Sequence, residues 1–105
     1  MRFINLTPHA LNIHTPEGVI NLPPSGEVAR VAMTRTPAGD VAGIPTATVV
    51  YGEVTSLPAP VEGATFIVSG MVAAAVRRED VLSPGPLVRD EAGRPIGCLG
   101  LTRSV

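Results

Sequence analysis

Ser69 and Gly70 stand where the apolar run Phe66-Ile67-Val68 passes into a stretch of helix formers, and this junction is the first candidate for chemistry. Ser69 is placed to cap a helix over residues 70–76. The first amide groups of such a helix attract anions such as phosphates. A serine nucleophile is disfavoured, because Ile67 stands where a nucleophile elbow requires glycine. The junction therefore predicts either a plain cap or an anion-binding site.

Four charged residues could recognise a phosphorylated ligand. Arg77, Arg78 and Asp80 follow the predicted helix, and Arg89 lies in the last predicted hairpin. Guanidinium groups grip phosphate in a bidentate manner, and a carboxylate accepts from a ribose hydroxyl or a base amine. The alternative is equally favoured: arginines at a helix C-terminus complement its dipole, and adjacent acids pair with them at the surface. For Arg89 a turn or cross-strand role is preferred.

His9 and Tyr51 are further candidates. His9 follows a proline in a Thr-Pro-His turn, where it could line a ligand pocket or act as a general base with Ser69, Asp80 or Cys98. A turn histidine that bonds the backbone is the favoured interpretation. Tyr51 could stack a single base, but three aromatic residues in the whole chain are too few for a platform that stacks successive bases.

The composition describes an apolar chain of low charge. The chain has eight arginines, no lysine and nine acidic residues, and its net charge is −1. This balance argues against binding to a nucleic-acid polymer, which favours a basic excess on one face. Charged residues make up 16% of the chain and the mean hydropathy is +0.32. So much aliphatic surface on 105 residues predicts a subunit interface, and we expect a homo-oligomer.

Cys98 is the sole cysteine, so neither an internal disulfide nor a cysteine zinc cluster is possible, and we expect its side chain to be buried. His9 and His14 lack helical ligand spacing, so we expect no metal and no cofactor.

The first eight residues lack the apolar core of a signal peptide, and the uncharged stretch 63–76 is too short to span a bilayer. We therefore expect a cytoplasmic protein without a membrane partner.

The elements that must position these residues are short strands. Eleven glycines and eleven prolines are spaced along the chain and predict many turns. Residues 11–14 and 19–22 flank Thr15-Pro16-Glu17-Gly18 and predict a hairpin. A second hairpin is predicted over residues 87–89 and 95–101.

Residues 36–40 predict a mobile loop, and the β-branched run 46–51 predicts a strand. Together these patterns predict a single domain over residues 1–105. We expect it to be mainly β, a small antiparallel barrel or sandwich with one short α-helix at about residues 70–76.

Seven short segments give the chain a recognisable order: residues 5–9 (NLTPH), 51–54, 57–60, 66–69, 80–85, 87–89 and 97–101. In this order they resemble a group of small phage and prophage proteins that open with an Asn-Leu-Thr-Pro-His element. Gly70 departs from the pattern, since a larger side chain is expected there. The resemblance spans nearly the whole chain, implies a phage protein inside a host cell, and carries no catalytic residues to transfer.

By analogy with phage anti-defence proteins, this context suggests a homo-oligomer that sequesters a nucleotide-derived immune signal without catalysis. The ligand would be a cyclic dinucleotide or an ADP-ribose derivative. Its expected binding residues are His9, Tyr51, Ser69, Gly70, Arg77, Arg78, Asp80 and Arg89. Two alternatives stay open: a protein-interaction module that inhibits a host enzyme or decorates a virion, and a small hydrolase or lyase that uses His9.

Overall fold

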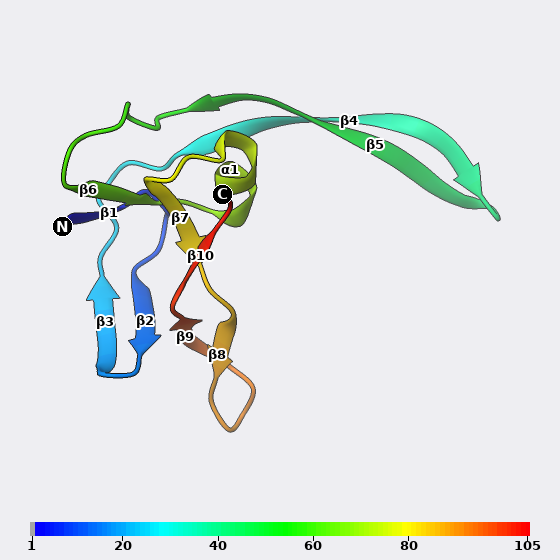
Figure 1. Cartoon of the computed structure of the whole chain (residues 1–105). Helices are drawn as coiled ribbons and strands as arrows, with labels where there is room; N and C mark the ends of the chain where they lie inside the picture. The colour runs from blue at the N-terminus through cyan, green and yellow to red at the C-terminus, as the bar shows by residue number, and fades with distance from the viewer. Residues whose placement is uncertain (1) are drawn as a thin grey trace.

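The structure is a computed structural model that describes residues 2–105, and this part of the chain is mainly β with one short helix (Figure 1). That prediction is confirmed. The elements follow in the order β1 (Arg2–Asn5), β2 (Leu11–Thr15), β3 (Gly18–Leu22), β4 (Arg30–Val41), β5 (Ile44–Thr55), β6 (Ala64–Ile67), α1 (Gly70–Val76), β7 (Val81–Pro84), β8 (Leu87–Arg89), β9 (Pro95–Leu99) and β10 (Leu101–Arg103).

The strands form three sheets. The central sheet has the order β1-β6-β7-β10, the outer sheet the order β3-β2-β9-β8, and β4 and β5 form a two-stranded arm. In the central sheet β6 pairs in parallel with both β1 and β7, whereas β10 runs antiparallel to β7. In the outer sheet β2 pairs in parallel with β9, so both four-stranded sheets are mixed and not purely antiparallel. None of the sheets formed by residues 2–105 closes into a barrel.

Both predicted hairpins are present. The pair β2 and β3 is antiparallel, with Ile13 opposite Ile20. The pair β8 and β9 is antiparallel, with Leu87 opposite Cys98. The second hairpin is shorter than expected, because the chain turns at Gly100, at a φ of 60°, and Leu101 pairs with β7 of the central sheet instead.

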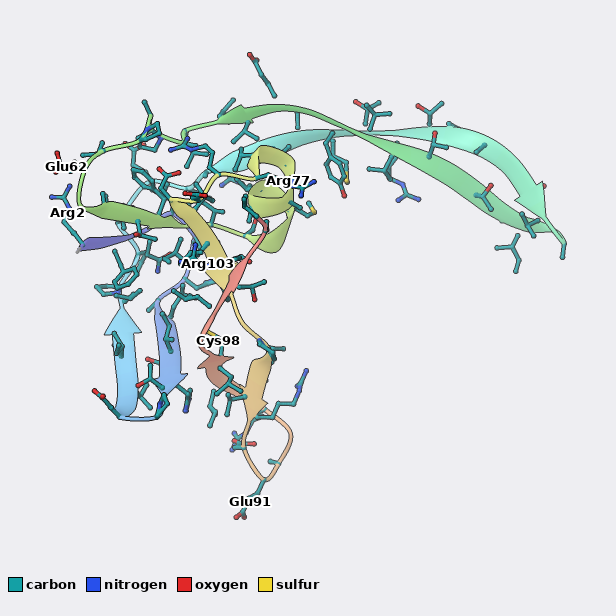
Figure 2. The ribbon with its side chains drawn as sticks, viewed as in Figure 1. Arg2, Glu62, Arg77, Glu91, Cys98 and Arg103 are labelled. Atoms are coloured by element: carbon teal, nitrogen blue, oxygen red, sulfur yellow. The ribbon has the colours of Figure 1, made fainter. Side chains whose placement is uncertain are left out.

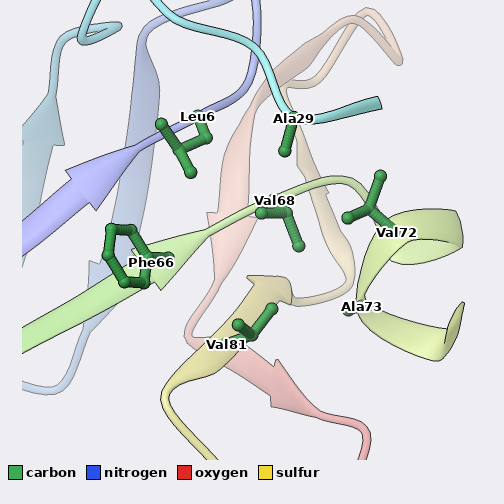
Figure 3. Close-up of a cluster of buried hydrophobic side chains, with 7 residues drawn as sticks. All are labelled: Leu6, Ala29, Phe66, Val68, Val72, Ala73 and Val81. Carbon is green, nitrogen blue, oxygen red and sulfur yellow. The ribbon is translucent and has the colours of Figure 1, made fainter. Parts of the chain in front are cut away.

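One face of the central sheet packs under the helix and holds the main hydrophobic cluster (Figure 3). Alternation along the strands places Phe66 of β6 and its register partner Val81 of β7 on this face. Their side chains are each 1% exposed, and burial of side chains this size stabilises the fold by about 1.5–3 kcal/mol each. The other members of the cluster are Leu6, Ala29, Val68, Val72 and Ala73.

The opposite face of the central sheet turns toward the outer sheet. The registers put Phe3, Ile67 and Leu82 on this side. Ile13 of β2 pairs with Cys98 of β9 in the outer sheet, and both side chains are buried. The expectation that Cys98 is buried is therefore confirmed.

The helix spans Gly70–Val76 as predicted. Ser69 caps its start, in an extended conformation, and its Oγ accepts a hydrogen bond of 3.4 Å from the Val72 amide. The helix ends at Arg77, which adopts a left-handed conformation and donates its backbone N–H to the Ala73 carbonyl.

The arm is the largest departure from expectation. Strands β4 and β5 have twelve residues each and extend away from the two sheets (Figure 1). The mobile loop expected over residues 36–40 is wrong, because these residues belong to β4 and Thr36 pairs with Thr48. The Pro and Gly that suggested a loop coincide with an irregular register between Pro37 and Asp40. A two-stranded ribbon tolerates them, since proline needs only an edge position.

Candidate functional site

The Asn-Leu-Thr-Pro-His element is a hydrogen-bonded turn whose first three residues are buried. Asn5 is 2% exposed and its side-chain amide donates to the carbonyl oxygens of His9, at 2.8 Å, and Leu22, at 3.0 Å. Its Oδ1 accepts from the backbone N–H of Thr7 at 2.9 Å and from the Thr7 hydroxyl at 2.6 Å. Asn5 therefore ties the end of β1 to the end of β3, and the element has a clear structural role.

The His9 side chain is exposed and lines a hollow of about 490 Å³. This hollow lies between β2 and the β8–β9 hairpin, and Cys98 also lines it. The Cys98 thiol is buried and donates to the Gly100 carbonyl oxygen at 3.5 Å. Ser69 and Asp80, the other partners considered for a general base, do not line this hollow.

Tyr51, Ser69 and Gly70 are brought together where the arm leaves the body. Tyr51 and Gly70 line a hollow of about 290 Å³ together with the exposed side of the helix. Ser69 lines a neighbouring hollow of about 230 Å³ between the helix and the start of β4, and Met71 borders both. The walls of these hollows are largely aliphatic, with the Tyr51 ring as the single aromatic group among them.

Arg78 and Asp80 are engaged with each other. Nε and Nη2 of Arg78 donate to the two carboxylate oxygens of Asp80, at 2.9 and 2.6 Å, and Nη1 donates to the Pro58 carbonyl oxygen at 3.1 Å. The Arg78 hydrogen bonds hold the pKa of the Asp80 carboxyl below its ordinary value of 3.8, against partial burial that raises it. This ion pair fixes the segment after the helix to the Pro58 loop.

The remaining two arginines lie on different parts of the molecule. Arg77 stands at the C-terminal end of the helix, where Figure 2 labels it. Arg89 lies on the β8–β9 hairpin and its Nη1 donates to the Gly93 carbonyl oxygen at 2.8 Å. The eight predicted binding residues therefore do not line one common site within a single copy: His9 and Arg89 lie apart from the Tyr51, Ser69 and Gly70 group.

The arm carries an apolar surface that the sequence patterns did not identify. Its exposed large side chains are Met33, Val41, Ile44, Val49, Val50 and Tyr51, at 38–66% exposure. The 26 residues from β4 through β5 contain four charges, on Arg30, Arg35, Asp40 and Glu53. The strand-like stretch 46–51 and the low charge of residues 30–55 were the available signal, but the expected loop at residues 36–40 divided the first strand of the arm and obscured it.

Among residues 2–105, no group of three or more His, Cys, Asp or Glu side chains could hold a metal ion. No helix in the same range is long and apolar enough to cross a membrane. Comparison with protein-family models, curated proteins and solved structures finds no match to this chain.

Proposed function

We propose that this chain is a non-catalytic interaction protein that associates with a second copy of itself through the β4–β5 arm. The observation that carries the proposal is the arm: a two-stranded sheet that pairs with no third strand among residues 2–105 and exposes large apolar side chains along its length. An isolated two-stranded ribbon is at best marginally stable in water, and a partner surface would stabilise it.

The exposed side chains suit an interface. Val50 and Tyr51 are 61% and 51% exposed, and tyrosine is among the side chains enriched at the positions that dominate association energies. Full burial of one such side chain is worth about 1.5–3 kcal/mol. Lysine is absent from the chain, and low charge density favours association over solubility as a monomer.

The test is the oligomeric state of a variant without the arm. Residues 34–50 are replaced by a two-residue Asn-Gly turn between Met33 and Tyr51, which face each other in the register. Val31 and Val54, which pack on the core, are kept. Sedimentation velocity should give an oligomer for the parent at about 100 μM and a monomer for the shortened chain. A parent that stays monomeric at this concentration would contradict the proposal.

The phage context and the sequestration of a nucleotide-derived signal form the second candidate. The observation that favours it is the hollow between Tyr51 and the helix, where an aromatic ring and an aliphatic wall could hold a base. Arg89 lies on the β8–β9 hairpin, so a phosphate donor from that position would have to come from another copy. The protein-interaction alternative, inhibition of a host enzyme or decoration of a virion, uses the same arm with a foreign partner.

Native mass spectrometry separates these candidates. The protein is purified from bacteria with active nucleotide-signalling defences and compared with a Tyr51→Ala variant. Additional mass equal to that of a nucleotide, present in the parent and lost in the variant, supports sequestration. An oligomer of the parent without added mass supports interaction alone.

A further inference from the structure

The tip of the arm is an apolar projection. Val41 and Ile44 face each other in the register across the Ala42-Gly43 turn, and both central residues have positive φ. With 64% and 66% exposure, Val41 and Ile44 are the most exposed large apolar side chains among residues 2–105. Asp40 is the one charged residue within three positions of the turn. Exposed apolar pairs at the end of a long ribbon are costly in water unless something covers them.

An apolar hollow lies elsewhere on the same chain, between the central and the outer sheet. It has a volume of about 200 Å³ and is walled by Phe3 and Leu101 on one side and by Ile13, Ile20 and Leu22 on the other. Thr15 is its single polar side chain, and the Thr15 hydroxyl already donates to the Gly18 carbonyl oxygen at 2.8 Å. Phe3 and Ile20 remain 41% and 48% exposed, so the two sheets do not close this side of the core.

We infer that the Val41–Ile44 tip of one copy inserts into the Phe3–Ile20–Leu101 hollow of a second copy. This inference rests on the proposed function and names the surface that receives the arm. The hollow has a volume of about 200 Å³ and an apolar lining, and both the hollow and the tip lose apolar area to water on contact.

Charged residues beside the hollow and beside the tip are consistent with the same contact. Arg103 follows Leu101 by two residues on β10 and so lies on the same face of the central sheet, where its side chain is exposed. Asp40 precedes Val41 directly. Insertion with Asp40 on the β10 side brings a carboxylate toward Arg103 and keeps it away from Glu17, which lies in the β2–β3 turn.

A tip that enters this hollow comes from another copy of the chain. Figure 1 shows the arm tip on the far side of the molecule from β3, so a chain cannot reach its own hollow. Tip and hollow are different surfaces, and the contact is therefore either reciprocal within a two-fold dimer or head-to-tail within a ring.

A complementation experiment tests this contact. Ile44→Asp places a charge on the tip, and Ile20→Asp places one in the hollow, at a half-exposed position of edge strand β3. Each variant alone should associate at least about a hundredfold more weakly than the parent in sedimentation equilibrium. An equimolar mixture should form a one-to-one dimer, because the intact tip of the Ile20→Asp chain fits the intact hollow of the Ile44→Asp chain.

The matched control is Leu99→Asp on the outer sheet. The Leu99 side chain is about as exposed as the tip residues, and His14, its register partner, lies on the face opposite buried Ile13. This control should associate like the parent. Unchanged association of the Ile20→Asp variant, or no dimer in the mixture, would overturn the inference. A parent that is monomeric in the same measurement would contradict the proposed function itself.

Discussion

Asn5 shows how one buried amide can organise a turn that looks like a functional motif. Its side chain satisfies two carbonyl oxygens and accepts from two groups of Thr7, all inside the protein. The sequence supplied the Asn-Leu-Thr-Pro-His pattern, but nothing in that pattern reveals that Asn5 points inward while His9 points to solvent.

Replacing Asn5 by alanine should therefore be costly. Asn5→Ala leaves the carbonyl oxygens of His9 and Leu22 without these partners and should lower the free energy of unfolding by about 2–4 kcal/mol. Urea denaturation of the parent and the variant measures the difference. Asn21→Ala is the matched control, since it removes an exposed bond to Asn12 and should change stability by at most about 0.5 kcal/mol. Similar losses in the two variants would refute the structural role of Asn5.

The Arg78–Asp80 pair should make stability depend on pH in the acid range. The pKa of Asp80 is lower in the folded protein than its ordinary value of 3.8. A carboxyl of this kind stabilises the fold above its unfolded-state pKa, and the stabilisation disappears as the pH falls through the folded-state pKa. Arg78→Met should raise the Asp80 pKa toward 3.8 and lower the unfolding free energy at pH 7 by about 1 kcal/mol.

The difference between parent and Arg78→Met should shrink as the pH falls below about 4, because protonated Asp80 no longer needs the arginine. Urea titrations from neutral to acid pH measure it. Arg94→Met is the control, since the Arg94 side chain is 79% exposed in its pair with Asp90. A difference that persists undiminished in acid would show that Arg78 acts through its bond to the Pro58 carbonyl and not through the ion pair.

At the scale of the element, the arm turn contains a residue in an unfavourable conformation. Ala42 has a φ of 51° and Gly43 a φ of 81°, the pattern of a two-residue hairpin turn that favours Asn-Gly. Ala42→Asn should stabilise the arm by about 0.5–1 kcal/mol, and Gly43→Ala should destabilise it by about 1 kcal/mol or more. Hydrogen exchange of the arm amides measures both. The stability of the arm must change in opposite directions in the two variants. Equal protection of the arm amides in both variants would contradict the turn geometry.

Local elements were the predictable part of this fold. The cap at Ser69, the helix at 70–76 and the turns of both hairpins depend on neighbouring residues, and the sequence shows them directly. The parallel pairing of β1 with β6 was not predictable, because it joins Arg2 to Ala64 and no short pattern encodes such a distant partner. The arm was missed because a ribbon solvated on both faces needs no alternation of polar and apolar residues.

The candidate site likewise has a part that the sequence predicts and a part that it does not. Ser69 and Gly70 were placed together by adjacency, and Tyr51 joins them because the arm starts beside the helix. That Arg78 and Asp80 satisfy each other, and that Arg89 bonds Gly93 within its own hairpin, depends on side-chain directions that a sequence does not contain. The sequence therefore shows which residue types could bind a ligand. It does not show which of these residues lie close together in the fold.

At the scale of the whole molecule, the arm makes the chain unusually extended. The radius of gyration is 16.3 Å, against about 13 Å for a compact domain of this length. Small-angle scattering of the variant without residues 34–50 should give about 12–13 Å. Its unfolding free energy should fall by no more than about 1 kcal/mol, because the main cluster lies outside the arm. Unfolding of this variant would show that the arm is an integral part of the core.

The hollow between the sheets has a kinetic consequence. The arm is a local hairpin with partners close in sequence, so it can form early, whereas the hollow requires Phe3 and Leu101, which are separated by almost the whole chain. On the inferred contact, a partly folded chain presents a tip but offers no receptor. Assembly would then wait for β10 to dock, which limits premature growth of aggregates during folding.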